Sequence, residues 1–385
     1  MINITQKENC CGCGACAQVC PKWCITMKAD AEGFLYPAVD PHLCVSCGLC
    51  EKVCPIENRP VPNAGPVEAY AAYTKDSELR ENSSSGGIFS ELSRWVLAQN
   101  GVVFGAAFAE DFSVHHIRID SEAEMDLLRG SKYTQSATEE TYQEARQLLQ
   151  KGRPVLFSGV ACQIAGLKNY LGKEYDHLYT VDVLCHGVPS PKVWQKHMHE
   201  QQAKRGNNVK AVRFRDKRSG WKNYSVSMAF DDGSEYCKEN RSDAYMRLFI
   251  GDICLRPSCH SCRFKDIPRA SDLTIGDAWG IQHHMPHMDD DRGTSIVLVH
   301  SEKGSRLWSQ ITPALICKQG QVNVLLPPTA ASRKPVKKHP NRKRFFAELD
   351  RGADIDQLVK LTKKPLLRRI LSAGKKCLKK LLQKR

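Results

Sequence analysis

The 385-residue sequence lacks any run of eighteen consecutive apolar residues. That absence excludes a membrane-spanning helix. Residues 1–9 also lack the apolar stretch of a secretory signal peptide, so we expect a cytoplasmic protein. In that compartment thiols stay reduced, and the 18 cysteines are not expected to form disulfide bonds. Because many of them are clustered at short, fixed spacings, they indicate metal ligation instead.

Most of the chain also lacks an excess of basic charge. Residues 333–385 hold 19 of the 56 Lys and Arg but only 4 of the 42 Asp and Glu, which leaves 37 basic and 38 acidic residues before them. A nearly neutral body does not provide the clustered basic face that nucleic-acid binding requires. We therefore expect no nucleic-acid partner.

The basic end of the chain carries an apolar stripe at helical spacing. After Pro365, leucine and isoleucine side chains between positions 366 and 382 fall on one face, and Lys and Arg fall on the other. Such a helix is suited to lie on an anionic membrane surface, but it can equally dock its leucines on the body. Both interpretations stay open, so peripheral contact with the inner face of the membrane is one expectation.

Two cysteine motifs of one type lie in the first 58 residues, and each ends in proline. They are Cys10, Cys13, Cys16 and Cys20 before Pro21, and Cys44, Cys47, Cys50 and Cys54 before Pro55. This spacing is the signature of bacterial two-cluster ferredoxins, in which the fourth cysteine of each motif ligates the other 4Fe-4S cluster. Cluster one then takes Cys10, Cys13, Cys16 and Cys54, and cluster two takes Cys44, Cys47, Cys50 and Cys20. Structural zinc would explain neither the third and fourth cysteines nor the prolines.

A different sequence pattern, which predicts alternating strands and helices, begins near residue 68 after a Pro-rich stretch at residues 59–66. Strands are predicted at 69–74, 102–108, 154–158, 178–184, 209–215, 224–230, 273–275 and 295–299. Helices are predicted at 87–99, 139–150, 161–171 and 192–205. The pattern indicates an α+β protein, with a ferredoxin-like module followed by a mixed α/β body and a basic helical tail.

A third group of cysteines lies in the body. Cys254, Cys259 and Cys262 form C-x4-C-x2-C, with Cys185 upstream, a spacing that resembles plant-type iron–sulfur sites. Cys162 competes with Cys254 for the place of fourth ligand. A third 4Fe-4S cluster is the favoured interpretation, and zinc or buried free thiols are the alternatives.

Two turns rich in serine and glycine have the form of an anion cradle. Residues 83–87 open a helix, and residues 158–163 follow an apolar strand and open the next helix. Backbone N–H groups at a helix start bind phosphate well. Serine and glycine are also common helix caps, so the pattern alone leaves a cofactor site and a simple cap equally open.

Five segments, at 84–89, 129–133, 158–167, 182–190 and 256–280, resemble the beta-subunit family of deazaflavin-coenzyme (F-420) hydrogenases and dehydrogenases. The resemblance spans roughly residues 66–330 and includes the usual fused ferredoxin module. It implies a non-covalent FAD in the body, next to a 4Fe-4S cluster. The implied cofactor-binding residues are Ser85, Gly86, Gly87, Ser131, Lys132, Gly159 and Gln163. Asp277, between Gly276 and Ala278, is a further candidate for contact with the cofactor, and a turn-forming aspartate is the equal alternative. Val160 and Ala161 replace the Thr-Pro of the family turn.

Two residues of these segments have side chains suited to catalysis. A lysine such as Lys132 stabilises negative charge on a flavin or phosphate. His186 follows Cys185 at the end of an apolar strand and can deliver a proton to a substrate. Both are therefore predicted as catalytic residues, with an exposed lysine and a locally bonded histidine as the plain alternatives.

These expectations divide the chain into a ferredoxin domain (1–58), a linker (59–67), two parts of a flavin-binding body (68–152 and 153–330) and a tail (331–385). The predicted function is an oxidoreductase that passes electrons from a ferredoxin or another redox protein, through its clusters and FAD, to a small organic acceptor. The rival interpretation is an electron-relay subunit of a hydrogenase or dehydrogenase, without a substrate of its own. The deazaflavin coenzyme itself is a minority expectation as the acceptor.

Overall fold

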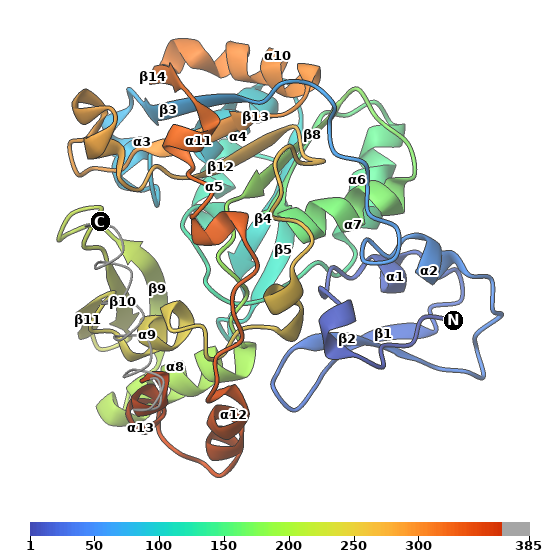
Figure 1. Ribbon diagram of the computed structural model, residues 1–385, viewed down its shortest axis with the longest axis vertical. Coiled ribbons are helices and arrows are strands. Elements are labelled where there is room, and N and C mark those ends of the chain that lie inside the picture. Colours follow the sequence, from blue (N-terminus) through green and yellow to red (C-terminus); the bar gives the residue numbers. More distant parts are fainter. Residues whose placement is uncertain (364–385) are drawn as a thin grey trace, which may run out of the picture.

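The computed structural model describes residues 1–363, with the N-terminal module beside a large central sheet (Figure 1). In this module β1 (Ile25–Ala29) pairs antiparallel with β2 (Leu35–Val39). The short helices α1 (Ala15–Gln18) and α2 (Leu49–Lys52) each lie inside one cysteine motif and begin after a glycine with positive φ. The paired motifs therefore give the ferredoxin-like arrangement that their spacing predicted.

The body is built on a nine-stranded mixed sheet in the order β14-β3-β13-β12-β8-β7-β4-β5-β6. Its parallel centre comprises β12 (Leu273–Asp277), β8 (Leu178–Val183), β7 (Val155–Val160) and β4 (Val102–Phe108). The flanking strands are β14 (Leu315–Gly320), β3 (Glu68–Thr74), β13 (Ser295–Val299), β5 (Val114–Ile119) and β6 (Ser136–Ala137). Apolar residues of the central strands alternate between the two faces, so both faces need a covering layer.

Helices provide these two layers. On one face lie α4 (Ile88–Ala98), α5 (Met125–Leu128) and α10 (Glu302–Ile311), whose apolar side chains pack on Val103 and Leu156. On the other face lie α6 (Thr141–Gln150) and α7 (Ala161–Leu171), which pack on Val102 and Phe157. The ferredoxin-like module contacts α7, because the sulfur of Cys13 lies 2.8 Å from the position that a Cβ on Gly166 would take.

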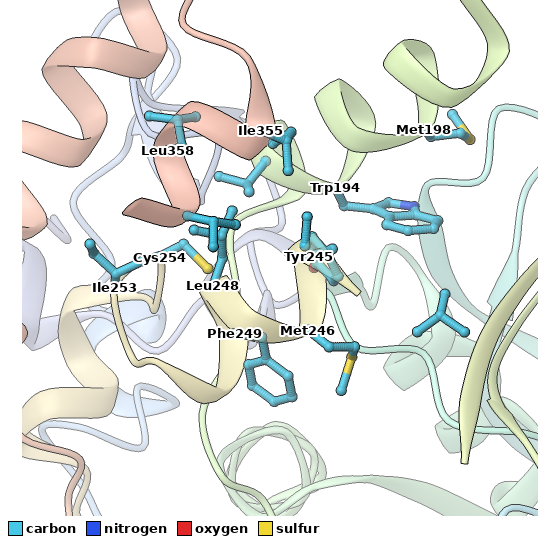
Figure 2. Close-up of a cluster of buried hydrophobic side chains, with 14 of the residues drawn as sticks. Trp194, Met198, Tyr245, Met246, Leu248, Phe249, Ile253, Cys254, Ile355 and Leu358 are labelled. Atoms are coloured by element: carbon cyan, nitrogen blue, oxygen red, sulfur yellow. The ribbon is translucent and has the colours of Figure 1, made fainter. Parts of the chain in front are cut away.

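A smaller subdomain lies below the main sheet in Figure 1. Its three-stranded sheet comprises β9 (Val209–Asp216), β10 (Ser225–Phe230) and β11 (Glu235–Glu239). Helices α8 (Pro191–Arg205), α9 (Ala244–Ile250), α12 (Arg342–Asp350) and α13 (Ile355–Val359) share an apolar core with it (Figure 2). The remaining short helices are α3 (Ser77–Glu81) and α11 (Val322–Leu325).

Part of the expected basic tail belongs to this subdomain. Phe345 of α12 is fully buried, and Leu358 of α13 is 1% exposed, so residues 342–359 are packed helices and not an appendage. The basic helix predicted after Pro365 lies outside the described residues. Within residues 1–363, no helix has both the length and the apolar character needed to cross a membrane.

Candidate functional site

A cavity of about 760 Å³ lies at the carboxyl ends of the parallel strands β7, β8 and β12. Ser158, Cys185 and Asp277 reach its wall from these three strands or from the turns that follow them. The starts of α4 and α7 and the loop at 129–136 complete the wall. The carboxyl edge of a parallel sheet is where α/β folds bind ligands. Every predicted cofactor-binding residue except Gly86 lines this cavity.

The serine–glycine turn before α4 is held rigidly from behind. Gly86 donates its N–H to Ser295 Oγ at 3.0 Å, and a Cβ at Gly86 would lie 2.4 Å from the carbonyl oxygen of Ala72. Only glycine allows this close approach to β3. Ser84 accepts hydrogen bonds from both the N–H (2.8 Å) and the hydroxyl (3.1 Å) of Ser131, which joins the turn to the loop that contains Lys132.

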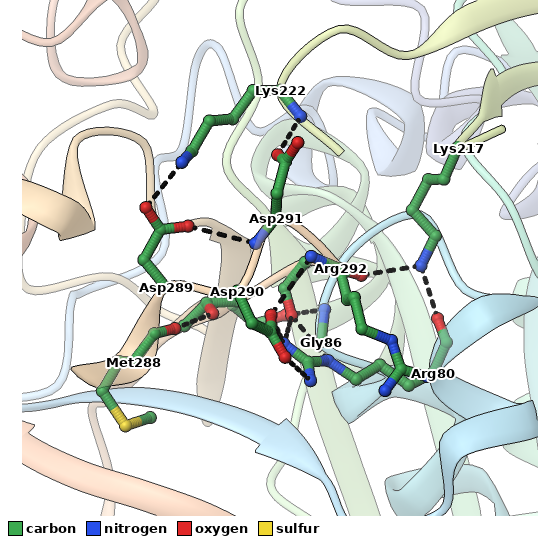
Figure 3. A network of polar contacts seen from close by, with 12 residues as sticks. Arg80, Gly86, Lys217, Lys222, Met288, Asp289, Asp290, Asp291 and Arg292 are labelled. Atoms are coloured by element: carbon green, nitrogen blue, oxygen red, sulfur yellow. Dashed lines mark hydrogen bonds and ion pairs between the residues drawn. The ribbon is translucent and has the colours of Figure 1, made fainter. Parts of the chain in front are cut away.

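A polar network next to the same turn joins α3 and β9 to the 289–293 loop (Figure 3). Arg80 makes a bidentate ion pair with Asp290, both contacts at 2.7 Å, and donates to the carbonyl oxygen of Gly293. Lys217 donates to the carbonyl oxygens of Arg80 (2.6 Å) and Arg292 (2.9 Å). These contacts fix the 289–293 loop against the turn, so the turn is preorganised without any ligand contact.

The ammonium group of Lys132 is already fully bonded. Its Nζ donates to the carbonyl oxygens of Leu127 (3.0 Å), Leu128 (3.0 Å) and Arg129 (2.8 Å) at the end of α5. A lysine has three N–H donors, so this arrangement uses all of them. Burial lowers the pKa of Lys132 to about 7. Its observed role is to cap α5 at the cavity wall, and a catalytic role stays a prediction.

Asp277 is the partner of a buried arginine that the sequence did not single out. Arg215 of β9 donates Nη1 and Nη2 to the carboxylate at 2.7 and 3.0 Å, and the indole N–H of Trp221 adds a bond of 2.9 Å. Trp279, 49% exposed at the cavity wall, stacks on Trp221 with ring centroids 4.6 Å apart. The carboxylate thus positions the cationic and aromatic groups of this wall.

Gln163 and His116 are also bound within the protein. Gln163 accepts from the N–H of Val160 at 3.0 Å and donates to the carbonyl oxygen of Ser136 at 3.2 Å, so it caps α7. His116 of β5 contacts the Ser136 hydroxyl (2.7 Å) and the Ser158 carbonyl oxygen (3.0 Å). Burial lowers the pKa of His116 to about 4, which keeps the ring neutral.

The cavity wall nevertheless retains unused polar groups. In the described residues, thirteen buried polar side-chain atoms have no hydrogen-bond partner, and six belong to residues that line the cavity. These six residues are Ser85, Ser90, Arg129, Thr134, Gln135 and Arg215. Buried polar groups are normally satisfied, so their concentration here fits a site for a polar ligand.

His186 faces the same cavity and has one strong partner. Its Nε2 lies 2.6 Å from Asp252 Oδ1, and its ring meets Phe249 edge-on. Asp252 has a positive φ of 62°, in the left-handed region that Asp tolerates better than most residues. The pair is about 30% exposed on each side and is positioned to contact a molecule in the cavity.

Four cysteines of the body converge beside the cavity. The thiol of Cys185 interacts electrostatically with those of Cys162, Cys259 and Cys262. Cys162 and Cys185 line the cavity itself. The N–H of Val188 points at Cys259 Sγ at 3.3 Å. Burial raises the pKa of Cys185 to about 12 and that of Cys259 to about 11, so both are neutral thiols here and would ionise at neutral pH only beside a positive centre.

Cys254 does not join this group through its side chain. It is fully buried in the apolar core of the subdomain, among Trp194, Tyr245 and Leu358 (Figure 2). Of the two candidates for the fourth position, Cys162 interacts with Cys185 and Cys262, and the third cluster itself stays a prediction. Cys11, which lay outside the predicted motifs, interacts with both Cys13 and Cys162 and links the two cysteine groups.

The ferredoxin-like module brings several of its motif cysteines together, and their assignment to two clusters stays a prediction. A small cavity is lined by Cys20, Cys44, Cys47 and Cys50, the four assigned to cluster two. Cys24 lines it as well, with its sulfur 3.3 Å from that of Cys20. In the other set, Cys16 interacts with Cys10 and Cys54. Within residues 1–363, no three His, Cys, Asp or Glu side chains gather around a single-ion site.

The sequence did not indicate four residues that contact the site from distant parts of the chain, which are Arg215, His116, Asp252 and Arg256. A charged residue inside an apolar cysteine motif, as in Cys254-Leu255-Arg256, was the one local signal that could have indicated a buried arginine. The other three contact the site only because strands and helices distant in the sequence meet there.

Comparison with known proteins agrees with the sequence motifs. Residues 152–323 match the family described as the C terminus of the coenzyme F420 hydrogenase/dehydrogenase beta subunit, and residues 9–58 match the 4Fe-4S dicluster domain. No protein of curated function matches the chain significantly. Among solved structures, a chain of the F420-reducing hydrogenase complex from Methanosarcina barkeri is 15% identical, with a TM-score of 0.45, over 78% of this chain and 90% of that chain.

The predicted resemblance is thus confirmed for the C-terminal part of the body, and its extension over residues 66–151 stays a prediction. The chain joins a segment that matches a 4Fe-4S dicluster domain to a segment that matches the C-terminal region of the coenzyme F420 hydrogenase/dehydrogenase beta-subunit family.

Proposed function

We propose that the chain is an iron–sulfur flavoprotein oxidoreductase, which passes electrons from its ferredoxin-type clusters through FAD to a small organic acceptor. One observation carries this proposal. The cysteine group of the body adjoins both the dicluster domain and the 760 Å³ cavity, because Cys162 interacts with Cys11 and both Cys162 and Cys185 line the cavity wall. A third 4Fe-4S cluster held by Cys162, Cys185, Cys259 and Cys262 would fit this position.

The cavity fits FAD by its chemistry. It offers the turn at 83–87, the start of α4 and six buried polar side-chain atoms without a hydrogen-bond partner among residues 1–363, as a cofactor with phosphates and a polar ring system requires. Bound there, a flavin supplies the conversion between one-electron and two-electron transfer. In this proposal Ser85, Gly87, Ser131 and Gly159 contact the cofactor, and Lys132, Gln163 and Asp277 hold the groups that do.

His186 is the residue we propose to hold the proton that an acceptor takes up. Asp252 orients the ring through Nε2, the nitrogen that contacts its carboxylate at 2.6 Å.

In the ferredoxin-like module, Cys47 of cluster two is exposed beside Val45 and Leu43, each more than half exposed. This face is the proposed entry point for electrons from a ferredoxin or another redox protein.

The second candidate is an electron-relay subunit that delivers electrons to a partner protein. Ile250 and Trp279 are each about half exposed although both line the cavity, so its mouth presents an apolar surface that a partner could cover. The matched family is one of beta subunits, which is in keeping with this alternative. Reoxidation of the reduced chain by small acceptors alone would favour the enzyme over the relay.

The third cluster provides a direct test with a matched control. Cys162→Ser removes a proposed ligand, whereas Cys254→Ser changes a buried cysteine of the apolar core. We expect the first variant to lose about four irons per chain and the second to keep all of them. Equal iron contents in the two variants would refute the proposed ligand set, and FAD lost only from Cys162→Ser would tie the cofactor to the same site.

A further inference from the structure

Arg256 is a buried cation that makes no ion pair with a carboxylate among residues 1–363. Its side chain is 1% exposed and donates to three neutral acceptors, which are the carbonyl oxygens of Cys10 (2.9 Å) and Leu35 (2.9 Å) and Oε1 of Gln135 (3.2 Å). A fourth contact, at 3.5 Å, runs from Nη2 to the sulfur of Cys10. Tyr36 lies under the guanidinium at 4.2 Å.

The other buried arginines of the described chain are all compensated. Each of these four makes an ion pair with Asp or Glu: Arg80 with Asp290, Arg215 with Asp277, Arg269 with Asp182, and Arg342 with Glu32. A buried charge normally requires a counter-charge, because its removal from water costs several kcal/mol. For Arg256 the nearest group that can carry negative charge is the Cys10 thiolate.

The backbone makes room for this contact. Gly12 has φ +73°, and a Cβ there would lie 2.9 Å from Nη1 of Arg256 and 2.5 Å from Nε2 of Gln135. A glycine at this position therefore lets the cysteine loop close over the guanidinium. Arg256 belongs to the body, where it lies between Cys254 and Cys259 in the sequence, and its side chain contacts Cys10 of the ferredoxin-like module.

From this geometry we propose that Arg256 is the counter-charge of cluster one and sets its reduction potential. Reduction adds one electron to the cluster and its four thiolates, with no bond broken and no proton required, so the complex becomes more negative by one charge. A fixed guanidinium next to Cys10 stabilises the reduced form more than the oxidised form and raises the midpoint potential. The inference rests on the assignment of Cys10 to the dicluster domain, and it does not depend on FAD or on a third cluster.

The test is a redox titration of the full chain, purified anaerobically and monitored by electron paramagnetic resonance. Arg256→Gln removes the charge, and Gln135→Glu gives the same guanidinium the carboxylate that it lacks with almost no change of shape. Both variants should move one reduction step to more negative potential and leave the other steps in place. Arg256→Lys, which keeps the charge, should stay close to the wild type.

Arg342→Gln is the matched control, because it removes a buried arginine whose charge is paired with Glu32. It should shift the same reduction step less than Arg256→Gln does. An unchanged midpoint in Gln135→Glu at full iron content would overturn the proposal, even where Arg256→Gln loses its cluster. So would an equal shift of all steps, or an equal shift in Arg256→Lys and Arg256→Gln.

Discussion

Replacing Asp277 by asparagine removes the negative charge from a buried ion pair and keeps the shape of the side chain. The partner, Arg215, has 2% of its side chain exposed and Asp277 has 18%, so water can solvate neither group well. Arg215 otherwise lies 4.1 Å from the ring of Tyr224 and 5.2 Å from that of Trp279, and within residues 1–363 it has no ion pair besides that with Asp277. The variant therefore retains a buried guanidinium without its counter-charge.

The expected loss of unfolding free energy is large for a single isosteric change. Breaking a buried pair by removal of one partner costs about 3–5 kcal/mol. Because Arg215 is one of the most deeply buried cations of the chain, we expect about 3 kcal/mol or more for Asp277→Asn. The matched control is Asp266→Asn, since Asp266 is 71% exposed and its pair with Arg59 lies in solvent. Exposed pairs contribute less than about 1 kcal/mol.

Urea denaturation followed by far-UV circular dichroism measures both variants under one set of conditions. The shift of the midpoint multiplied by the slope gives the change in free energy. A loss for Asp277→Asn no larger than that for Asp266→Asn would refute the view that the Arg215–Asp277 pair is a desolvated structural support of the cavity.

Three further predictions concern other parts of the chain. Because the pKa of His116 is about 4 in the fold and ordinarily 6.5, the unfolded chain binds this proton more readily, and stability falls as pH drops through 6.5. His116→Gln should remove about 1 kcal/mol of the wild-type loss between pH 6.5 and 5.5 in urea titrations. Gly12→Ala and Gly48→Ala both place a side chain at φ +73°, but only the Cβ at position 12 would contact other residues, among them Arg256. The iron content per chain should therefore fall in Gly12→Ala and stay unchanged in Gly48→Ala, and equal iron contents would contradict the contact with Arg256. Phe345→Ala should lower the unfolding free energy by about 3–5 kcal/mol, and a change under 1 kcal/mol would mean that α12 is not part of the core.

The cysteine motifs and eight strands could be predicted because their signals are local, whereas β1, β2, β5, β6, β11 and β14 were not predicted. The spacing of four cysteines and a proline determines which sulfurs can share a cluster, and a buried parallel strand such as β7 is a continuous apolar run. The predicted helix at 161–171 has the same bounds as α7. These features depend on neighbours a few residues away, which a single sequence contains.

The partners of the site could not be predicted in the same way. The distance from Arg215 to Asp277 is 62 residues along the chain, and Arg256 meets Cys10 across 246 residues. No periodicity encodes such pairs, because they arise only when the sheet and the ferredoxin-like module pack together. Lys132 is the opposite case, because its partners are close in the sequence. Its ammonium group donates to three carbonyl oxygens within five residues, and the family resemblance did not indicate this local arrangement.

Quantification of iron, acid-labile sulfide and flavin in one anaerobically purified sample tests the central claim most directly. Two clusters in the dicluster domain, a third in the body and one cofactor in the cavity predict about twelve irons, about twelve sulfides and one FAD per chain. About eight irons with no flavin would contradict the flavoprotein account and leave the dicluster domain as the only redox centre of the chain.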